Sequence, residues 1–313
     1  MTYEEIQQLN TDKQVISFSR LARLVWLAKW YVVVITLIGS LATLIYAISL
    51  PNIYRANAIY LPKGAQDAGA LSKLAGQFGG LASMAGISLG GAGEDKTDAL
   101  LEYLQSRSFL QQFIDRHNLL VPLLAAEGWD PQAGKLIIDP SVYDETTQTW
   151  VRTPPPGMAV IPTSWEAYEP LLKLIRVSYQ SKKGYVELSV SYYSPKMAAD
   201  WLTWLVADLN AYWKQREHER NTTTIAFLTK QAEQSQFSEL RAVFYQLIAE
   251  QTKSGLLAEI SDEVMLESMA PVVVPEYKHS PSRALLCIVG AFLSGVLGVI
   301  VALIVSIRRE NRA

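Results

Sequence analysis

Cysteine and histidine are scarce in this sequence of 313 residues. The only cysteine is Cys287, and the three histidines, His117, His218 and His279, stand far apart in the sequence. A single cysteine cannot form a disulfide within the chain, so packing or assembly has to hold the fold together. No histidine has the i,i+4 histidine or the neighbouring cysteine of a common metal site. We therefore expect no disulfide and no metal site.

The phosphate-loop motif of nucleotide binding is also missing. Five residues separate Gly128 from Gly134, one more than a phosphate loop has, and Leu136 stands where a serine or threonine would meet magnesium. Acidic pairs such as Asp98 and Glu102 are i,i+4 neighbours on an exposed helix face. The sequence predicts no enzyme, no catalytic residue and no cofactor.

Charged residues are absent from two long runs. No Asp, Glu, Lys or Arg occurs from Trp30 to Tyr54 or from Ala284 to Ile307. Each run is longer than the roughly 20 apolar residues that cross a hydrocarbon core about 30 Å thick. A cleaved signal peptide fits the first run poorly, because 29 mostly polar residues precede it. We predict transmembrane helices at 30–50 and 284–307.

The charged residues that are present indicate how the chain crosses the membrane. Basic residues gather in the short end segments 1–29 and 308–313, namely Lys13, Arg20, Arg23, Lys29, Arg308, Arg309 and Arg312. By the positive-inside rule, both ends are expected in the cytoplasm. Residues 51–283 then lie outside, with 21 basic and 26 acidic side chains and a net charge of −5. That balance argues against a nucleic-acid partner.

The external part has the pattern of an α+β base domain. Alternation predicts a strand between Pro51 and Pro62 and a hairpin over 174–192, which together can form a small mixed sheet covered by a helix at 96–118. Seven prolines predict irregular chain at 131–170. Segment 64–93 holds nine glycines and seven alanines. It is either a flexible loop with a short helix or a segment lying on the membrane or a neighbouring protein.

A long helix is predicted after this hairpin. Ser194-Pro195 is a helix start, and no Gly or Pro follows until Gly255. An unbroken helix over 194–258 would reach about 90 Å at 1.5 Å per residue and would project away from the membrane. Its apolar stripe has no evident partner in the chain. We expect it to associate with other copies of the protein through Leu202, Leu205 and Leu209.

Small residues recur at every fourth position of the second apolar run: Gly290, Ser294, Gly298 and Ala302. Such a stripe lets helix backbones approach closely in lipid. The stripe predicts helix packing against the first span, another copy or a partner protein. A proline-rich segment with Pro271, Pro275, Pro281 and Arg283 leads into this run and is expected close to the membrane.

These features, in this order, resemble the bacterial chain-length determinant family, the Wzz-type polysaccharide co-polymerases without a kinase domain. The similarity covers nearly the whole chain. It includes Pro51–Pro62 after the first span, the strand-turn-strand and Pro-Ala helix start from Leu174 to Ala199, the helix end at Glu250-Gln251-Thr252-Lys253, and the return through Pro271, Pro275, Pro281 and Arg283. The resemblance predicts an α+β membrane protein with two transmembrane helices flanking a periplasmic base and a long protruding helix. The expected parts are a cytoplasmic segment 1–29, a periplasmic domain 51–283 with its base at 51–193 and 259–283, and a cytoplasmic tail 308–313.

The resemblance also implies a function. It predicts a protein of the Gram-negative inner membrane that regulates the chain length of a surface polysaccharide, either O-antigen or a related capsule or exopolysaccharide. The implied partners are further copies in a ring of about eight, an integral-membrane polymerase, the lipid-linked glycan and membrane lipid. An alternative is an export co-polymerase that works with a separately encoded tyrosine kinase. A periplasmic sensor is disfavoured, because only 29 and about six residues are expected in the cytoplasm.

Overall fold

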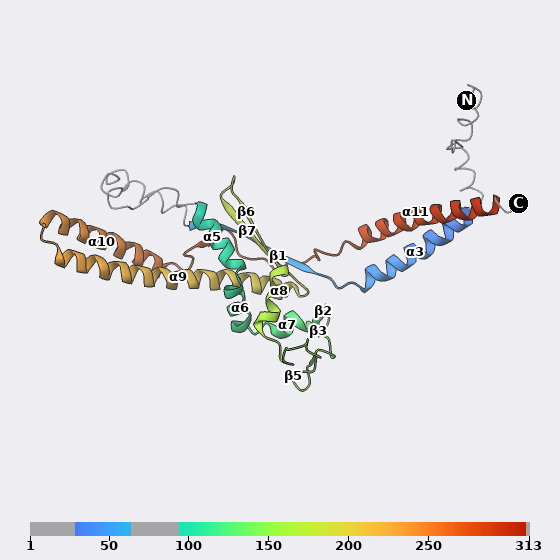
Figure 1. Cartoon of the computed structure of the whole chain (residues 1–313), viewed down its shortest axis with the longest axis horizontal. Helices are drawn as coiled ribbons and strands as arrows, with labels where there is room; N and C mark the ends of the chain where they lie inside the picture. Colours follow the sequence, from blue (N-terminus) through green and yellow to red (C-terminus); the bar gives the residue numbers. More distant parts are fainter. Residues whose placement is uncertain (1–28, 64–93, 311–313) are drawn as a thin grey trace, which may run out of the picture. The chain divides into compact units, whose positions relative to one another are not determined.

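The computed structural model describes residues 29–63 and 94–310 (Figure 1). The chain forms two compact units, one made of Met1–Pro51 with Ser280–Ala313 and the other of Asn52–His279. The Gly/Ala-rich segment 64–93, for which the sequence leaves two readings open, lies outside the described residues.

The first unit is a pair of helices, α3 (Lys29–Ser49) and α11 (Arg283–Glu310). They coincide closely with the two predicted spans. Both helices are long and apolar enough to cross a membrane, with mean hydropathies of 2.3 and 2.8 in their most apolar windows. Only 6% and 11% of the residues in these windows are buried, whereas a core helix of a soluble protein is mostly buried. Their apolar surfaces are therefore mostly uncovered within the chain, as is typical of membrane-spanning helices.

The second unit mixes helices and strands, which confirms the α+β class. In chain order its elements are β1 (Tyr54–Pro62), α5 (Glu94–Gln105), α6 (Arg107–Arg116), α7 (Leu120–Leu124), β2 (Ala126–Asp130), β3 (Lys135–Ile138), β4 (Tyr143–Asp144), β5 (Thr149–Trp150), α8 (Ser164–Leu174), β6 (Ile175–Gln180), β7 (Tyr185–Tyr192), α9 (Pro195–Gln234), α10 (Ser238–Ile260) and β8 (Leu266–Ser268).

The main sheet has the strand order β6-β7-β1-β8, and every neighbouring pair is antiparallel. The predicted mixed sheet is therefore wrong. Alternation in sequence shows which face of a strand is buried, but it does not fix the direction of the neighbouring strand. On the buried face, Ala56 lies opposite Val190 and Ala58 lies opposite Leu188. The predicted strand and hairpin are both present.

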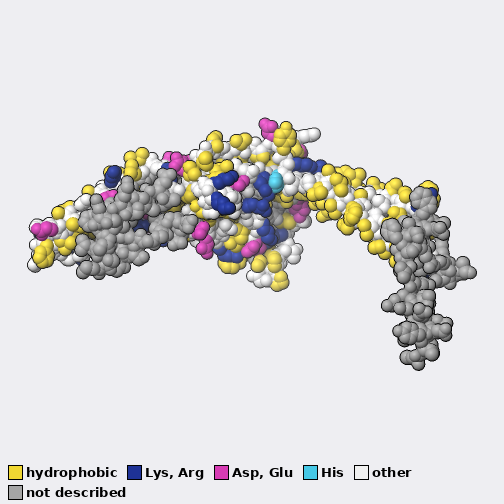
Figure 2. Space-filling model, turned by 90° about the horizontal axis from the view of Figure 1, so that it is seen from above, with side chains coloured by type: hydrophobic (Ala, Val, Ile, Leu, Met, Phe, Trp, Pro, Cys, Tyr) yellow, Lys and Arg dark blue, Asp and Glu magenta, His cyan; other side chains and the backbone are white. Residues whose placement is uncertain are grey.

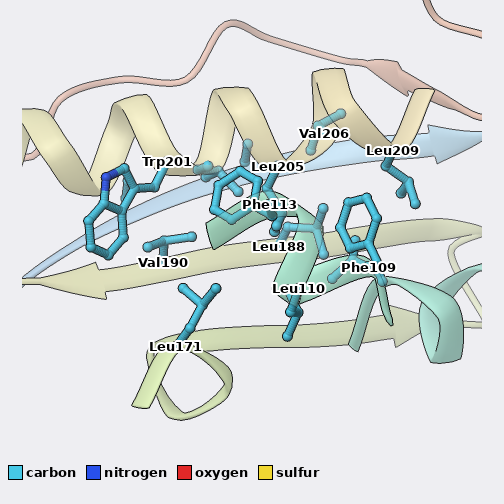
Figure 3. Packing of buried hydrophobic residues seen from close by; sticks show 14 of the residues in the cluster. Phe109, Leu110, Phe113, Leu171, Leu188, Val190, Trp201, Leu205, Val206 and Leu209 are labelled. Atoms are coloured by element: carbon cyan, nitrogen blue, oxygen red, sulfur yellow. The ribbon is translucent and has the colours of Figure 1, made fainter. Parts of the chain in front are cut away.

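The core lies between this sheet and the first half of α9, with α5, α6 and α8 completing it (Figure 3). The predicted helix at 96–118 is two helices. Ser106 caps the second one by accepting a hydrogen bond from the Phe109 amide at 3.3 Å. The predicted irregular segment 131–170 also contains short strands and the start of α8, where Thr163 and Glu166 form a capping box.

The single helix predicted over 194–258 is a helical hairpin, so that prediction is wrong. Helix α9 ends at Gln234, and α10 begins at Ser238 and packs back along α9 (Figure 1). The 40 residues of α9 span about 60 Å instead of about 90 Å. No Gly or Pro marks the break. It is held instead by Arg241, whose Nη2 donates to the Ser235 carbonyl oxygen at 2.8 Å.

Polar contacts fix the pairing of the two hairpin helices. Gln251 of α10 donates a hydrogen bond to the Asn221 side chain of α9, and Lys214 Nζ of α9 lies 3.5 Å from a carboxylate oxygen of Asp262, just after α10. Gly255 allows the close approach at this point, because a Cβ there would lie 3.2 Å from Asn221 Nδ2. Lys214, in the middle of α9, therefore has its ion-pair partner just after α10 of the same chain.

Candidate functional site

The small-residue stripe of α11 faces α3. A Cβ at Gly290 would overlap the Thr43 side chain, and a Cβ at Gly298 would lie 3.1 Å from Val32 Cα. The approach is mutual, since a Cβ at Gly39 of α3 would overlap Ser294 of α11. These glycines bring the two helix backbones close together, as is typical of helix pairs in lipid.

The two remaining members of the stripe contribute to the same contact. Ser294 Oγ donates to the Ala291 carbonyl oxygen at 3.1 Å and lies 3.5 Å from the Thr36 carbonyl oxygen. Ala302 is completely buried. Among the three partners that the sequence left open for the stripe, the structure places the first apolar helix of the same chain against it.

The proline-rich segment divides between the two units. Pro271 and Pro275 lie in extended chain after β8, and the His279 amide donates to the Ile53 carbonyl oxygen at 2.8 Å. Pro281 and Arg283 belong to the helix-pair unit, and the Ser280–Pro281 peptide bond is cis.

Arg283 connects the ends of the two apolar helices. Its Nε donates to the Ala47 carbonyl oxygen at 3.0 Å, and its Nη2 donates to the Leu50 carbonyl oxygen at 3.3 Å. Carbonyl groups in the last turn of a helix have no partner within the helix. Arg283 supplies donors to this end of α3 and so ties it to the start of α11.

The three leucines predicted to join copies of the protein do something else. Leu202, Leu205 and Leu209 are all 0% exposed and pack in the core of their own chain, as Figure 3 shows for the last two. Their assignment to oligomerisation is wrong. The spacing of the apolar residues correctly identified the buried face of α9. That face packs against the sheet, α5 and α6 of the same chain, not against a second copy.

The distal hairpin carries the apolar surface that is not covered. No residue of α10 is fully buried, and large apolar side chains on α10, at its N-cap and on the second half of α9 are between 39% and 81% exposed. They are Phe227, Phe237, Leu240, Val243, Tyr245, Leu247, Leu256, Leu257 and Ile260. Such a large exposed apolar surface is typical of a protein interface.

A pocket of about 230 Å³ lies between α6 and α9, lined by Phe109, Gln112, Phe113, Arg116, Asp208, Ala211, Tyr212 and Gln215. Asp208 is held from two sides, by Arg116 Nη1 at 2.8 Å and His117 Nε2 at 3.0 Å. The His117 ring stacks on Trp204 with 4.7 Å between centroids. This network connects the end of α6 to α9 and has a structural role. Sequence analysis missed it, because its members are about 90 residues apart and form no local motif.

Within residues 29–63 and 94–310, no group of three or more His, Cys, Asp or Glu side chains is placed to hold a metal ion.

Comparison with known families identifies the first third of the chain. Residues 14–117, which include the first apolar helix, match the Wzz family model, described as chain length determinant protein. This region belongs to the chain length determinant family. The resemblance predicted from the sequence is thereby confirmed for this region. No curated protein matches the chain significantly.

Two solved structures are distantly similar to the chain. The first is a full-length bacterial polysaccharide co-polymerase, with 13% sequence identity and a TM-score of 0.38, covering 95% of this chain and 100% of that one. The second is a fragment of WzzB, a polysaccharide co-polymerase from Salmonella Typhimurium, with 12% identity and a TM-score of 0.28, covering 73% of this chain and 100% of that one.

Proposed function

We propose that this chain length determinant is a polysaccharide co-polymerase of the inner membrane that regulates the length of a surface polysaccharide. It has no catalytic chemistry of its own and works beside an integral-membrane polymerase that extends a lipid-linked glycan. The observation that carries this proposal is the match of residues 14–117 to the Wzz family model. Two apolar helices that flank a large α+β unit support it.

In the proposed topology both termini are in the cytoplasm and residues 52–279 form the periplasmic domain. The basic residues at both ends of the chain favour this orientation. The paired helices α3 and α11 anchor the domain, and contact with the polymerase is assigned to their outer, lipid-facing surfaces, because the small-residue stripe is already used between them.

The proposed assembly is a ring of about eight copies. Its contacts involve the exposed apolar side chains of the distal hairpin, since Leu202, Leu205 and Leu209 are not available. A second copy would remove these side chains from water, which is the main favourable contribution to association. The glycan would be the O-antigen of lipopolysaccharide or a related capsule or exopolysaccharide.

The test is a gel of surface polysaccharide from a strain in which the coding sequence is deleted. The expected result is a change in the modal length of one glycan, with its total amount maintained and the original ladder restored by the wild-type chain. The glycan that changes is thereby identified. A ladder that is unchanged for every surface polysaccharide would refute the proposal. Loss of the glycan altogether, together with dependence on a tyrosine kinase, would instead favour the alternative role in export.

A further inference from the structure

A group of cationic side chains lies on the face of the main sheet that is turned away from the core. Arg55 is on β1, Arg176 is on β6, and His279 is in the segment that returns past the start of β1. Arg55 precedes the buried Ala56, and its side chain points to the opposite face, where its Nε donates to Ser191 Oγ on β7 at 3.0 Å. We call Arg55, Arg176 and His279 the arginine patch. Figure 2 shows Lys and Arg side chains gathered around a histidine.

The charges of the arginine patch are close enough to perturb one another. Partial burial and the charge of Arg176 lower the pKa of Arg55, an effect that Glu187 partly offsets. Partial burial, Arg55 and Arg176 lower the pKa of His279. The three groups therefore interact electrostatically, and the Glu187 carboxylate partly offsets the repulsion at Arg55.

The guanidinium groups also have unused hydrogen-bond donors. The Ser191 contact occupies only one nitrogen of Arg55, and Arg176 makes no ion pair or hydrogen bond with any described residue. A guanidinium group presents five N–H donors in a planar fork that fits two phosphate oxygens. Two neighbouring guanidinium groups repel each other, and an anion bound between them offsets that repulsion.

Covalent connectivity limits what this anion is. Arg55 follows the last residue of α3, Ser49, by six positions, and His279 precedes the first residue of α11, Arg283, by four. Six residues reach at most about 22 Å and four at most about 14 Å, whatever the orientation of the sheet. The headgroup layer on each side of the hydrocarbon core is itself about 5–8 Å thick. The phosphate groups of lipids are therefore the concentrated anions within reach of the arginine patch.

We propose that Arg55, Arg176 and His279 form a binding site for the phosphate groups of a membrane lipid. The two guanidinium groups bind the phosphate oxygens and His279 supplies a further hydrogen bond. The source of the phosphate is either the headgroup of an anionic phospholipid or the diphosphate of a polyprenyl-linked glycan. Neither the site nor its test requires that the chain regulates polysaccharide length.

The experiment measures lipid binding to the full chain in detergent by native mass spectrometry. Three probes are added separately: phosphatidylglycerol, farnesyl diphosphate, and diacylglycerol as a lipid without phosphate. The test variant is Arg55→Gln/Arg176→Gln. The matched control is Lys182→Gln/Lys183→Gln, which removes the same charge from the turn at the far end of the same sheet.

The wild type and the lysine control should bind a phosphate lipid, and Arg55→Gln/Arg176→Gln should bind it at least tenfold more weakly. Preference for phosphatidylglycerol assigns the site to headgroups, and preference for farnesyl diphosphate assigns it to the lipid-linked glycan. Arg55→Lys/Arg176→Lys keeps the charge but loses the fork, and should bind with intermediate affinity, which guards against misfolding of the glutamine variant. Equal binding of diacylglycerol, or equal loss in the lysine control, would overturn the proposal.

Discussion

Gly290 of α11 and Thr43 of α3 are in such close contact that the glycine has no space for even a methyl group. Gly295, one turn further along α11, is different, because a Cβ there would lie 3.7 Å from Thr36 Oγ1, an ordinary van der Waals distance. Substitution by alanine therefore tests the close contact at Gly290, and the same substitution at Gly295 serves as the control.

We predict that Gly290→Ala destabilises the helix pair and that Gly295→Ala does not. Overpacking of a close contact costs about 1–3 kcal/mol. The thermal midpoint of the purified chain in detergent should fall for Gly290→Ala and stay near the wild-type value for Gly295→Ala. The larger change Gly290→Leu/Gly298→Leu should also alter the polysaccharide ladder. Equal midpoints for the two alanine variants, or an unchanged ladder at normal protein level for the leucine variant, would contradict this account.

The second prediction separates core residues from assembly residues. Leu257 on α10 is 62% exposed, whereas Leu205 on α9 is completely buried. Leu257→Glu should reduce the size of the detergent-solubilised particle while leaving the thermal midpoint of the domain nearly unchanged. Leu205→Ala should lower stability by about 2–5 kcal/mol through the cavity that it leaves. Light scattering and thermal unfolding measure the two effects.

Three outcomes bear on this assignment. A smaller particle for Leu257→Glu supports assembly through the distal hairpin. An unchanged particle for Leu257→Glu/Val243→Glu would show that the hairpin surface is not an interface between copies. A stable, smaller particle for a charged substitution at Leu205 would show that the core assignment is wrong.

The third prediction concerns Asn210, a buried amide that joins α9 to β8. Its Nδ2 donates to the Leu266 carbonyl oxygen, and its Oδ1 accepts from the amides of Met265 and Leu266, all at 3.0 Å. Asn210→Ala removes these contacts and leaves buried backbone groups without partners, each at a cost of about 1–3 kcal/mol. Chemical denaturation should show a clear loss of stability, while the exposed Asn57→Ala should show little. Similar midpoints for both variants would contradict the role of Asn210.

Much of the fold could be predicted because the relevant signals are local. The absence of charge marks both apolar helices, and alternation along 174–192 marks the β-hairpin. The small-residue stripe indicated close packing, although not which helix would provide it. Local sequence signals show which face of a helix or strand is buried. They do not show which other element buries it, so the elements were predicted correctly more often than their packing partners.

The errors arose where a covered face had to be matched with a distant partner. Leu202 and its neighbours show the period of a buried stripe, and nothing in that period distinguishes the sheet of the same chain from a second copy. The hairpin turn at 235–237 lacks Gly and Pro, so the return of α10 along α9 left no local mark. Asp208 likewise meets Arg116 and His117 only in the folded chain.

The last prediction uses the ion pair that closes the loop before α8. Arg152 contacts Glu166 at 2.7 Å, and both side chains are only 14% exposed. The hydrogen bond from Arg152, helped by the Thr163 amide, lowers the pKa of Glu166. A carboxyl whose pKa is lowered by folding stabilises the protein above its unfolded value of about 4.3, and this contribution disappears as the pH falls through the folded value. The stability of the wild type should therefore decline on acidification below about pH 4.3 more steeply than that of Glu166→Gln. Glu169→Gln is the control on the same helix, because Glu169 is 60% exposed and lies 3.7 Å from Arg107. Denaturation midpoints at a series of pH values test this prediction.

Parallel pH profiles for the wild type and Glu166→Gln would show that protonation of Glu166 is not coupled to folding.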